Sequence, residues 1–140
     1  MKKLVNSLNE RLAVAGSGNP KRSVEELAAH VLGCKPLEIY FREITPEQQA
    51  ELESLIARAE QGEPIQYIIG HVDFRGLEIH CDPRALIPRP ETELLVEAVL
   101  GSESRVQGSL KIIDVCTGTG CIGLALAHEM PNAQVMAIDI

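Results

Sequence analysis

The chain has 140 residues, of which 45% are apolar and 24% charged, and it carries a formal net charge of −7. This composition predicts a soluble globular protein, with one ordinary domain or one small domain joined to part of another. The net negative charge argues against a protein that coats nucleic acid, because neutralising phosphates requires clustered Lys and Arg.

Residues 1–69 carry the pattern of a small helical bundle. Residues 2–15 place apolar side chains at helical spacing, and the segment 16–20 ends that helix. Ser23 and Glu26 form a capping-box pattern that predicts the start of a second helix, which Gly33 ends. Thr45 with Gln48 gives the same start signal for a third helix, which closes at Gly62. Charge is uneven here, at +4 over residues 1–22 and −6 over residues 23–63, which indicates either solvated helix faces or a docking surface for a protein.

No leader or membrane segment is expected. Polar residues interrupt the first helix, whereas a signal peptide needs about 7–15 unbroken apolar residues. No window approaches the ~20 apolar residues of a membrane span. We therefore expect a cytoplasmic protein.

The segment 70–90 changes from helical to alternating periodicity. Residues 64–70 could be a last helical turn or a strand, and the sequence leaves this open. Two short alternating runs around Arg75 and Gly76 predict a β-hairpin that ends at Asp82 and Pro83. The prolines of residues 86–93 then force an extended backbone before a helix that begins near Glu91.

Residues 91–140 predict the first βαβ unit of a larger sheet. A polar loop over 101–109 leads to an apolar strand that ends near Val115, then a glycine turn and a helix to about Met130. A second buried strand follows and ends at Asp139. A right-handed connection would place Gly118 and Asp139 at the same carboxyl edge of the sheet. The fold class is therefore α/β, with a helical bundle and a hairpin linker before the βαβ unit.

The cysteines and histidines do not predict a metal site. Cys34, Cys81, Cys116 and Cys121 include no CxxC pair, and no Cys or His spacing suits zinc. The four histidines are also scattered. We expect these eight side chains to pack or to lie on the surface.

The glycine turn is the candidate ligand site. Gly118, Gly120 and Gly123 spell the dinucleotide fingerprint GxGxxG, and Asp139 lies where a ribose-binding acid would fall, so an NAD-binding oxidoreductase fragment is one interpretation. Asp114 argues against it, because a carboxylate four residues before Gly118 suits a ligand with a positive amino or sulfonium group better than a pyrophosphate. A turn that binds nothing is a further alternative, and so is a non-catalytic module whose bundle docks a protein.

The segment from Asp114 to Gly123, Asp-Val-Cys-Thr-Gly-Thr-Gly-Cys-Ile-Gly, resembles the first motif of class I S-adenosylmethionine-dependent methyltransferases. Residues 64–70, the Phe-Arg-Gly of the hairpin and Ile-Pro-Arg-Pro-Glu-Thr-Glu at residues 87–93 resemble one branch, the HemK/PrmC protein-glutamine N5-methyltransferases. The resemblance implies a class I (Rossmann-like) domain and S-adenosyl-L-methionine as cofactor. It also implies methylation of the glutamine in the Gly-Gly-Gln motif of peptide-chain release factors, by a monomer. Residues 1–69 would recognise the substrate, 70–90 would be the hairpin linker and 91–140 would begin the methyltransferase domain.

The resemblance also implies a set of cofactor-binding residues. Cys116, Thr117, Gly118, Thr119 and Gly120 would lie against the methionine part of the cofactor. Asp139 would accept hydrogen bonds from the ribose hydroxyls, and Asp114 would lie behind the loop near the positive end of the ligand.

This chain departs from the family pattern in two ways. Cys116 replaces a glycine, which we expect to restrict this position to the φ values open to other residues. The Asn-Pro-Pro-Tyr motif that binds the acceptor amide is not within residues 1–140, so we assign no catalytic residue. We expect the isolated 140-residue chain to be inactive and to bind the cofactor weakly or not at all.

Overall fold

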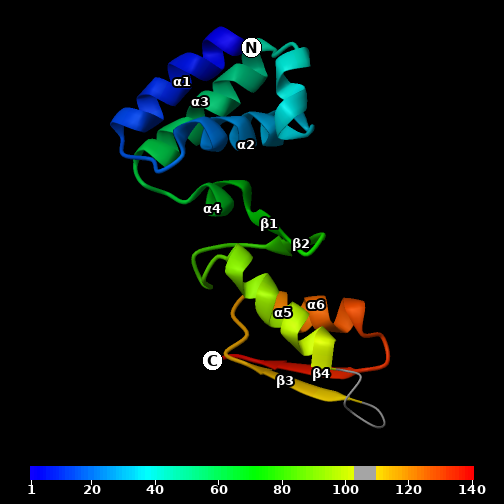
Figure 1. Ribbon diagram of the computed structural model, residues 1–140. Helices are drawn as coiled ribbons and strands as arrows, with labels where there is room; N and C mark the ends of the chain where they lie inside the picture. Colours follow the sequence, from blue (N-terminus) through cyan, green and yellow to red (C-terminus); the bar gives the residue numbers. More distant parts are fainter. Residues whose placement is uncertain (103–109) are drawn as a thin grey trace. The chain divides into compact units, whose positions relative to one another are not determined.

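The computed structural model describes residues 1–102 and 110–140. These form two compact units, Met1–Ile69 and Gly70–Ile140, and Figure 1 shows helices alone in the first and both helices and strands in the second. The predicted loop over 101–109 begins later than expected, because Gly101 and Ser102 still belong to a helix. Its residues 103–109 lie outside the described part of the chain.

The first unit is the predicted bundle, built from four α-helices and one 3₁₀ helix. These are α1 (Lys2–Val14), α2 (Pro20–Leu32), η1 (Pro36–Phe41), α3 (Pro46–Glu60) and α4 (Ile65–Ile69). Their apolar stripes meet in one aliphatic core, whose fully buried members include Leu8, Leu27, Leu52 and Ile56. The undecided segment 64–70 is helical, with Ile68 buried in this core.

The helix starts and ends follow local capping chemistry. The Thr45–Gln48 capping box is confirmed, and Gly33 ends α2 in the left-handed conformation with φ 59°. The predicted start of α2 at Ser23 is wrong. The helix begins at Pro20, because the Asn19 side chain accepts the backbone N–H of Arg22 and Pro tolerates the first helical position.

The second unit begins with the predicted hairpin, β1 (His71–Phe74) and β2 (Leu77–His80), paired antiparallel. Its two turn residues, Arg75 and Gly76, have φ values of 52° and 76°. Positive φ at both positions is typical of a type I′ turn, whose twist matches that of the strands. Helix α5 (Pro90–Ser102) follows the proline-rich segment, close to the predicted start.

The βαβ order is also confirmed, with β3 (Lys111–Val115), α6 (Cys121–Glu129) and β4 (Gln134–Ile138). The two strands are parallel, with Ile113 opposite Met136 and Val115 opposite Ile138. A core formed by Phe74, Val96, Ala125 and Leu126 lies between the hairpin and helices α5 and α6, and partly buried Ile112 and Val135 of the strands pack against it. The other face of these strands is exposed and apolar.

Within residues 1–102 and 110–140, no helix is both long and apolar enough to cross a membrane.

Candidate functional site

The loop between β3 and α6 has a tightly wound backbone. Cys116, Gly118 and Gly120 have φ values of 60°, 56° and 79°, alternating with Thr117 and Thr119. The expected restriction of Cys116 to φ values open to non-glycine residues holds, because 60° lies in the small left-handed region that such residues can adopt, at a cost that glycine avoids. The backbone N–H of Thr117 donates to the carbonyl of Ile138 at 3.1 Å, which ties the loop to the end of β4.

Asp114 holds this loop from behind. Its Oδ2 accepts hydrogen bonds from Thr117 Oγ1 at 2.6 Å and from the backbone N–H of Gly123 at 3.0 Å. The second bond joins the end of β3 to the first turn of α6. A Cβ at Gly123 would lie only 3.2 Å from that Oδ2 atom, so the close approach favours glycine. The carboxylate thus shapes the loop that the sequence analysis assigned to a ligand.

Asp139 closes the loop from the end of β4. Its Oδ1 accepts the backbone N–H of Ile140 at 2.8 Å and its Oδ2 accepts that of Gly118 at 2.5 Å. These two N–H groups lower the pKa of the Asp139 carboxyl. An ionised carboxylate has about four acceptor sites, so lone pairs remain for a further donor. The side chain is exposed and can reach a ligand.

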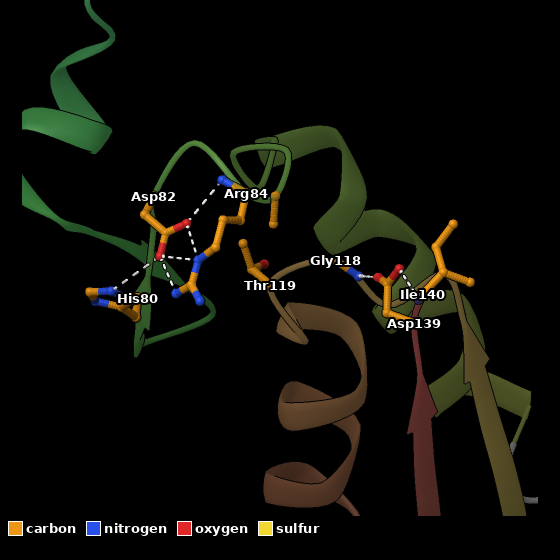
Figure 2. Close-up of a pocket in the computed structure, with 8 residues that line it drawn as sticks. His80, Asp82, Arg84, Gly118, Thr119, Asp139 and Ile140 are labelled. Carbon is orange, nitrogen blue, oxygen red and sulfur yellow. Dashed lines mark hydrogen bonds and ion pairs between the residues drawn. The ribbon is translucent and has the colours of Figure 1, made fainter.

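A pocket of about 410 Å³ opens beside this loop, within the ~300–1,000 Å³ range of small-molecule sites. Three predicted site residues, Gly118, Thr119 and Asp139, line it, and Figure 2 shows them with the residues that complete the wall. The other predicted residues do not belong to its lining: Asp114, Cys116, Thr117 and Gly120.

The remaining wall comes from residues that the sequence analysis did not assign to the site. It consists of His80, Asp82, Arg84, Ala85 and Ile140. The Arg84 guanidinium pairs with the Asp82 carboxylate through two nitrogens, with Nε 2.9 Å from Oδ1 and Nη2 2.5 Å from Oδ2. The backbone N–H of Arg84 also donates to Asp82 Oδ1 at 2.9 Å. This guanidinium holds the pKa of the Asp82 carboxyl well below its usual range.

A local signal for this wall was present in the sequence. An Asp followed by Pro favours a turn in which the carboxylate accepts the N–H two residues later. The Asp82–Arg84 contact is such a turn. In the sequence, Asp82 and Pro83 indicate only the end of the hairpin, so the side chains that follow are not assigned to the site.

Arg75 connects the hairpin turn to both helices of this unit. Its Nε lies 2.5 Å from Glu129 of α6, and its Nη1 lies 3.4 Å from Glu97 of α5. Its backbone N–H donates to Glu93 of α5 at 3.3 Å. Because β2 leads to one pocket wall and α6 begins at the other, this cluster helps to fix the two walls relative to each other.

No metal chemistry is indicated where the structure is described. Among residues 1–102 and 110–140, no group of three or more His, Cys, Asp or Glu side chains could hold a metal ion. The four cysteines, all within those ranges, are free thiols.

Comparison with known proteins shows which family the chain is similar to. Residues 3–70 match the model of the PrmC N-terminal domain. A protein named release factor glutamine methyltransferase from Koribacter versatilis is 41% identical over 143 residues, covering 100% of this chain and 51% of the relative. Proteins with the same name from Thermodesulfovibrio yellowstonii and Vibrio cholerae are 42% and 39% identical, covering 84% and 97% of this chain and 43% and 48% of the relatives. The chain is therefore similar to the PrmC family, and the similarity extends over its whole length.

The PrmC family resemblance is therefore confirmed, and it extends beyond the helical unit through the glycine loop. The relatives' names favour the methyltransferase interpretation over the NAD-dependent one. The chain spans about half the length of the curated relatives it matches.

Proposed function

We propose that this chain is part of a methyltransferase that uses S-adenosyl-L-methionine to methylate N5 of the glutamine in the Gly-Gly-Gln motif of peptide-chain release factors. The observation that carries the proposal is that Gly118 and Asp139 are hydrogen-bonded at one pocket, in a chain whose relatives are named release factor glutamine methyltransferase. The finer details of cofactor, acceptor motif and site residues are part of the proposal.

The chemistry of the pocket fits the cofactor. The lone pairs of Asp139 that Gly118 and Ile140 leave available can accept both hydroxyls of a ribose cis-diol. Gly118 has only Ala85 near the position of an added Cβ, at 4.0 Å, so the loop presents bare backbone to a ligand. Residues 116–120 would then lie against the methionine part.

Asp114 acts indirectly in this proposal. Both of its hydrogen bonds go to the loop and to α6, and they set the positions of Thr117 and Gly123. We assign it the role of fixing the loop conformation, with its negative charge stabilising the positive end of the cofactor at longer range.

The bound cofactor supplies the methyl group as an electrophile on a sulfonium. The acceptor amide nitrogen is a poor nucleophile, because its lone pair is delocalised into the carbonyl. Catalysis then depends on in-line positioning and on polar groups that favour the resonance form with the lone pair on the nitrogen. This chain's residues bind and orient the cofactor, and we assign no catalytic residue among them.

We assign separate roles to the parts of the chain. Residues 1–69 would recognise the release factor, 70–90 would form the hairpin and linker, and 91–140 would begin the methyltransferase domain. If residues 1–69 alone bind a release factor as tightly as the complete gene product in a pull-down, recognition lies in the bundle. That result would support the docking-module alternative for this part.

A ligand-binding comparison tests the cofactor assignment. The complete gene product is titrated with S-adenosylhomocysteine and with NAD by calorimetry. We expect S-adenosylhomocysteine to give heat of binding and NAD to give none. Binding of NAD alone would overturn the proposal in favour of the oxidoreductase alternative.

The same titration on residues 1–140 tests the expectation for the isolated chain. The open apolar face of β3 and β4 leaves this part of the sheet without cover. We therefore expect weak binding or none and no methyl transfer, and micromolar affinity would contradict this expectation.

A further inference from the structure

We propose that Arg84 binds the carboxylate at the amino-acid end of the cofactor, at the side of the pocket away from Asp139. The inference rests on the proposed function, because it takes the ligand to be S-adenosylmethionine. It adds a specificity-determining residue from the turn after β2, outside the glycine loop.

Arg84 and Asp139 line the same pocket, and Figure 2 shows Gly118 and Thr119 between them. Ala85, which follows Arg84, approaches the Gly118 position closely. A ligand with its ribose on Asp139 and its methionine part along the glycine loop would extend past Thr119 toward Arg84.

Arg84 is the one arginine in the pocket lining given by the described residues, and a guanidinium stays protonated at all working pH values. Asp82 and Asp139 are the acids of the same lining. A ligand carboxylate would be repelled by either acid, so Arg84 is the place in this wall where it gains attraction.

Arg84 keeps hydrogen-bond donors that a ligand can use. The bonds to Asp82 use Nε and Nη2 of a group with five N–H donors, so further donors remain for a second carboxylate. The Arg84 side chain is 86% exposed, and a ligand can therefore reach it. Asp82 meanwhile keeps the guanidinium at the pocket wall. The planar fork of Arg suits a carboxylate better than the point charge of Lys.

The test compares two ligands that differ in one group. S-adenosylmethionine and decarboxylated S-adenosylmethionine are titrated by calorimetry into the complete gene product, as wild type and as Arg84→Gln. The matched control is Arg22→Gln in the helical unit, because Arg22 is also an exposed arginine paired with a carboxylate, at 2.7 Å from Glu26.

We expect the wild type and Arg22→Gln to bind S-adenosylmethionine about tenfold more tightly than the decarboxylated ligand, as a charged hydrogen bond provides. We expect Arg84→Gln to lose about tenfold in affinity for S-adenosylmethionine and to bind the decarboxylated ligand as the wild type does. Retained binding of the decarboxylated ligand also shows that the variant is folded.

Two outcomes separate the possible failures. If Arg84→Gln lowers the affinity for both ligands equally, or for neither, Arg84 does not bind the carboxylate. The inference is then wrong while the proposed function stands. If the wild type binds neither ligand, the proposed function fails and the inference fails with it.

Discussion

The Asp139 carboxylate accepts the backbone N–H of Gly118 at 2.5 Å, although the two residues lie 21 positions apart in the sequence. This bond joins the end of β4 to the loop after β3. It exists because the two strands are parallel and end at the same edge. One side chain therefore shapes the loop and is available to a ligand.

Replacing Asp139 by Ala removes the acceptor for Gly118, for Ile140 and, in our proposal, for the ribose. We expect the affinity of the complete gene product for S-adenosylhomocysteine, measured by calorimetry, to fall by at least about tenfold. The control is Asp73→Ala, because Asp73 accepts a backbone N–H in the hairpin turn, at Gly76, outside the pocket. Equal affinity losses in the two variants would contradict a specific role for Asp139.

The contact between Asp114 and Gly123 predicts an unusual response to alanine. Ala ordinarily stabilises a helix interior relative to Gly by about 1 kcal/mol. At Gly123 an added Cβ would lie 3.2 Å from Asp114 Oδ2 and would disturb its bonds, so we expect Gly123→Ala to lower the melting temperature. Gly101→Ala in α5 meets no atom of residues 1–102 and 110–140 within 4 Å, and we expect it to leave the melting temperature unchanged or to raise it. A stabilising Gly123→Ala would show that Asp114 does not constrain α6.

The conformation of Cys116 predicts a gain in stability from glycine. At φ 60° a side chain costs about 1–2 kcal/mol, which glycine avoids. We expect Cys116→Gly to stabilise the protein toward urea by about 1 kcal/mol, after the larger chain entropy of glycine offsets part of the gain. Cys116→Ala keeps the Cβ and serves as the control, with little expected change. If both variants are equally stable, the loop is not strained at this position.

Tyr40 gives the helical unit a dependence on alkaline pH. Its hydroxyl donates to Glu25 Oε1 at 2.5 Å, and this bond, with burial and the negative charge of Glu25, raises the pKa of Tyr40 to about 12. Because the folded pKa lies above the unfolded value, the bond contributes its full stability below about pH 10 and loses it as pH rises toward 12. We expect Tyr40→Phe to destabilise the protein by about 1 kcal/mol at pH 8, with the difference vanishing near pH 12 in urea titrations. A difference that is constant with pH would rule out a role for this hydroxyl.

The regular elements could be predicted from the sequence because their signals are local. Thr45 and Gln48 identify a helix start by themselves, and the Arg75–Gly76 pair between alternating runs indicates a hairpin. The start of α2 was misplaced because two cap signals compete, and the Asn19–Pro20 pair takes precedence over Ser23.

The site could be predicted only in part. Gly118 and Asp139 were placed at one edge because parallel strands require it. The turn from Asp82 to Arg84 was not assigned to the site, because its approach to Gly118 depends on how the hairpin packs on α5 and α6. The sequence limits the φ of Cys116 only to the values open to non-glycine residues, and the left-handed value of 60° depends on the hydrogen bonds that hold the loop, such as that from Thr117 N–H to Ile138.

The most direct test of the account is methyl transfer to a release factor. The complete gene product is incubated with a release factor and S-adenosylmethionine, and the peptide that contains Gly-Gly-Gln is analysed by mass spectrometry, with a release factor carrying Gly-Gly-Glu as the control. The account predicts the mass of one added methyl group on the glutamine and none on the control. A complete gene product that binds the cofactor but leaves this glutamine unmodified would contradict the account.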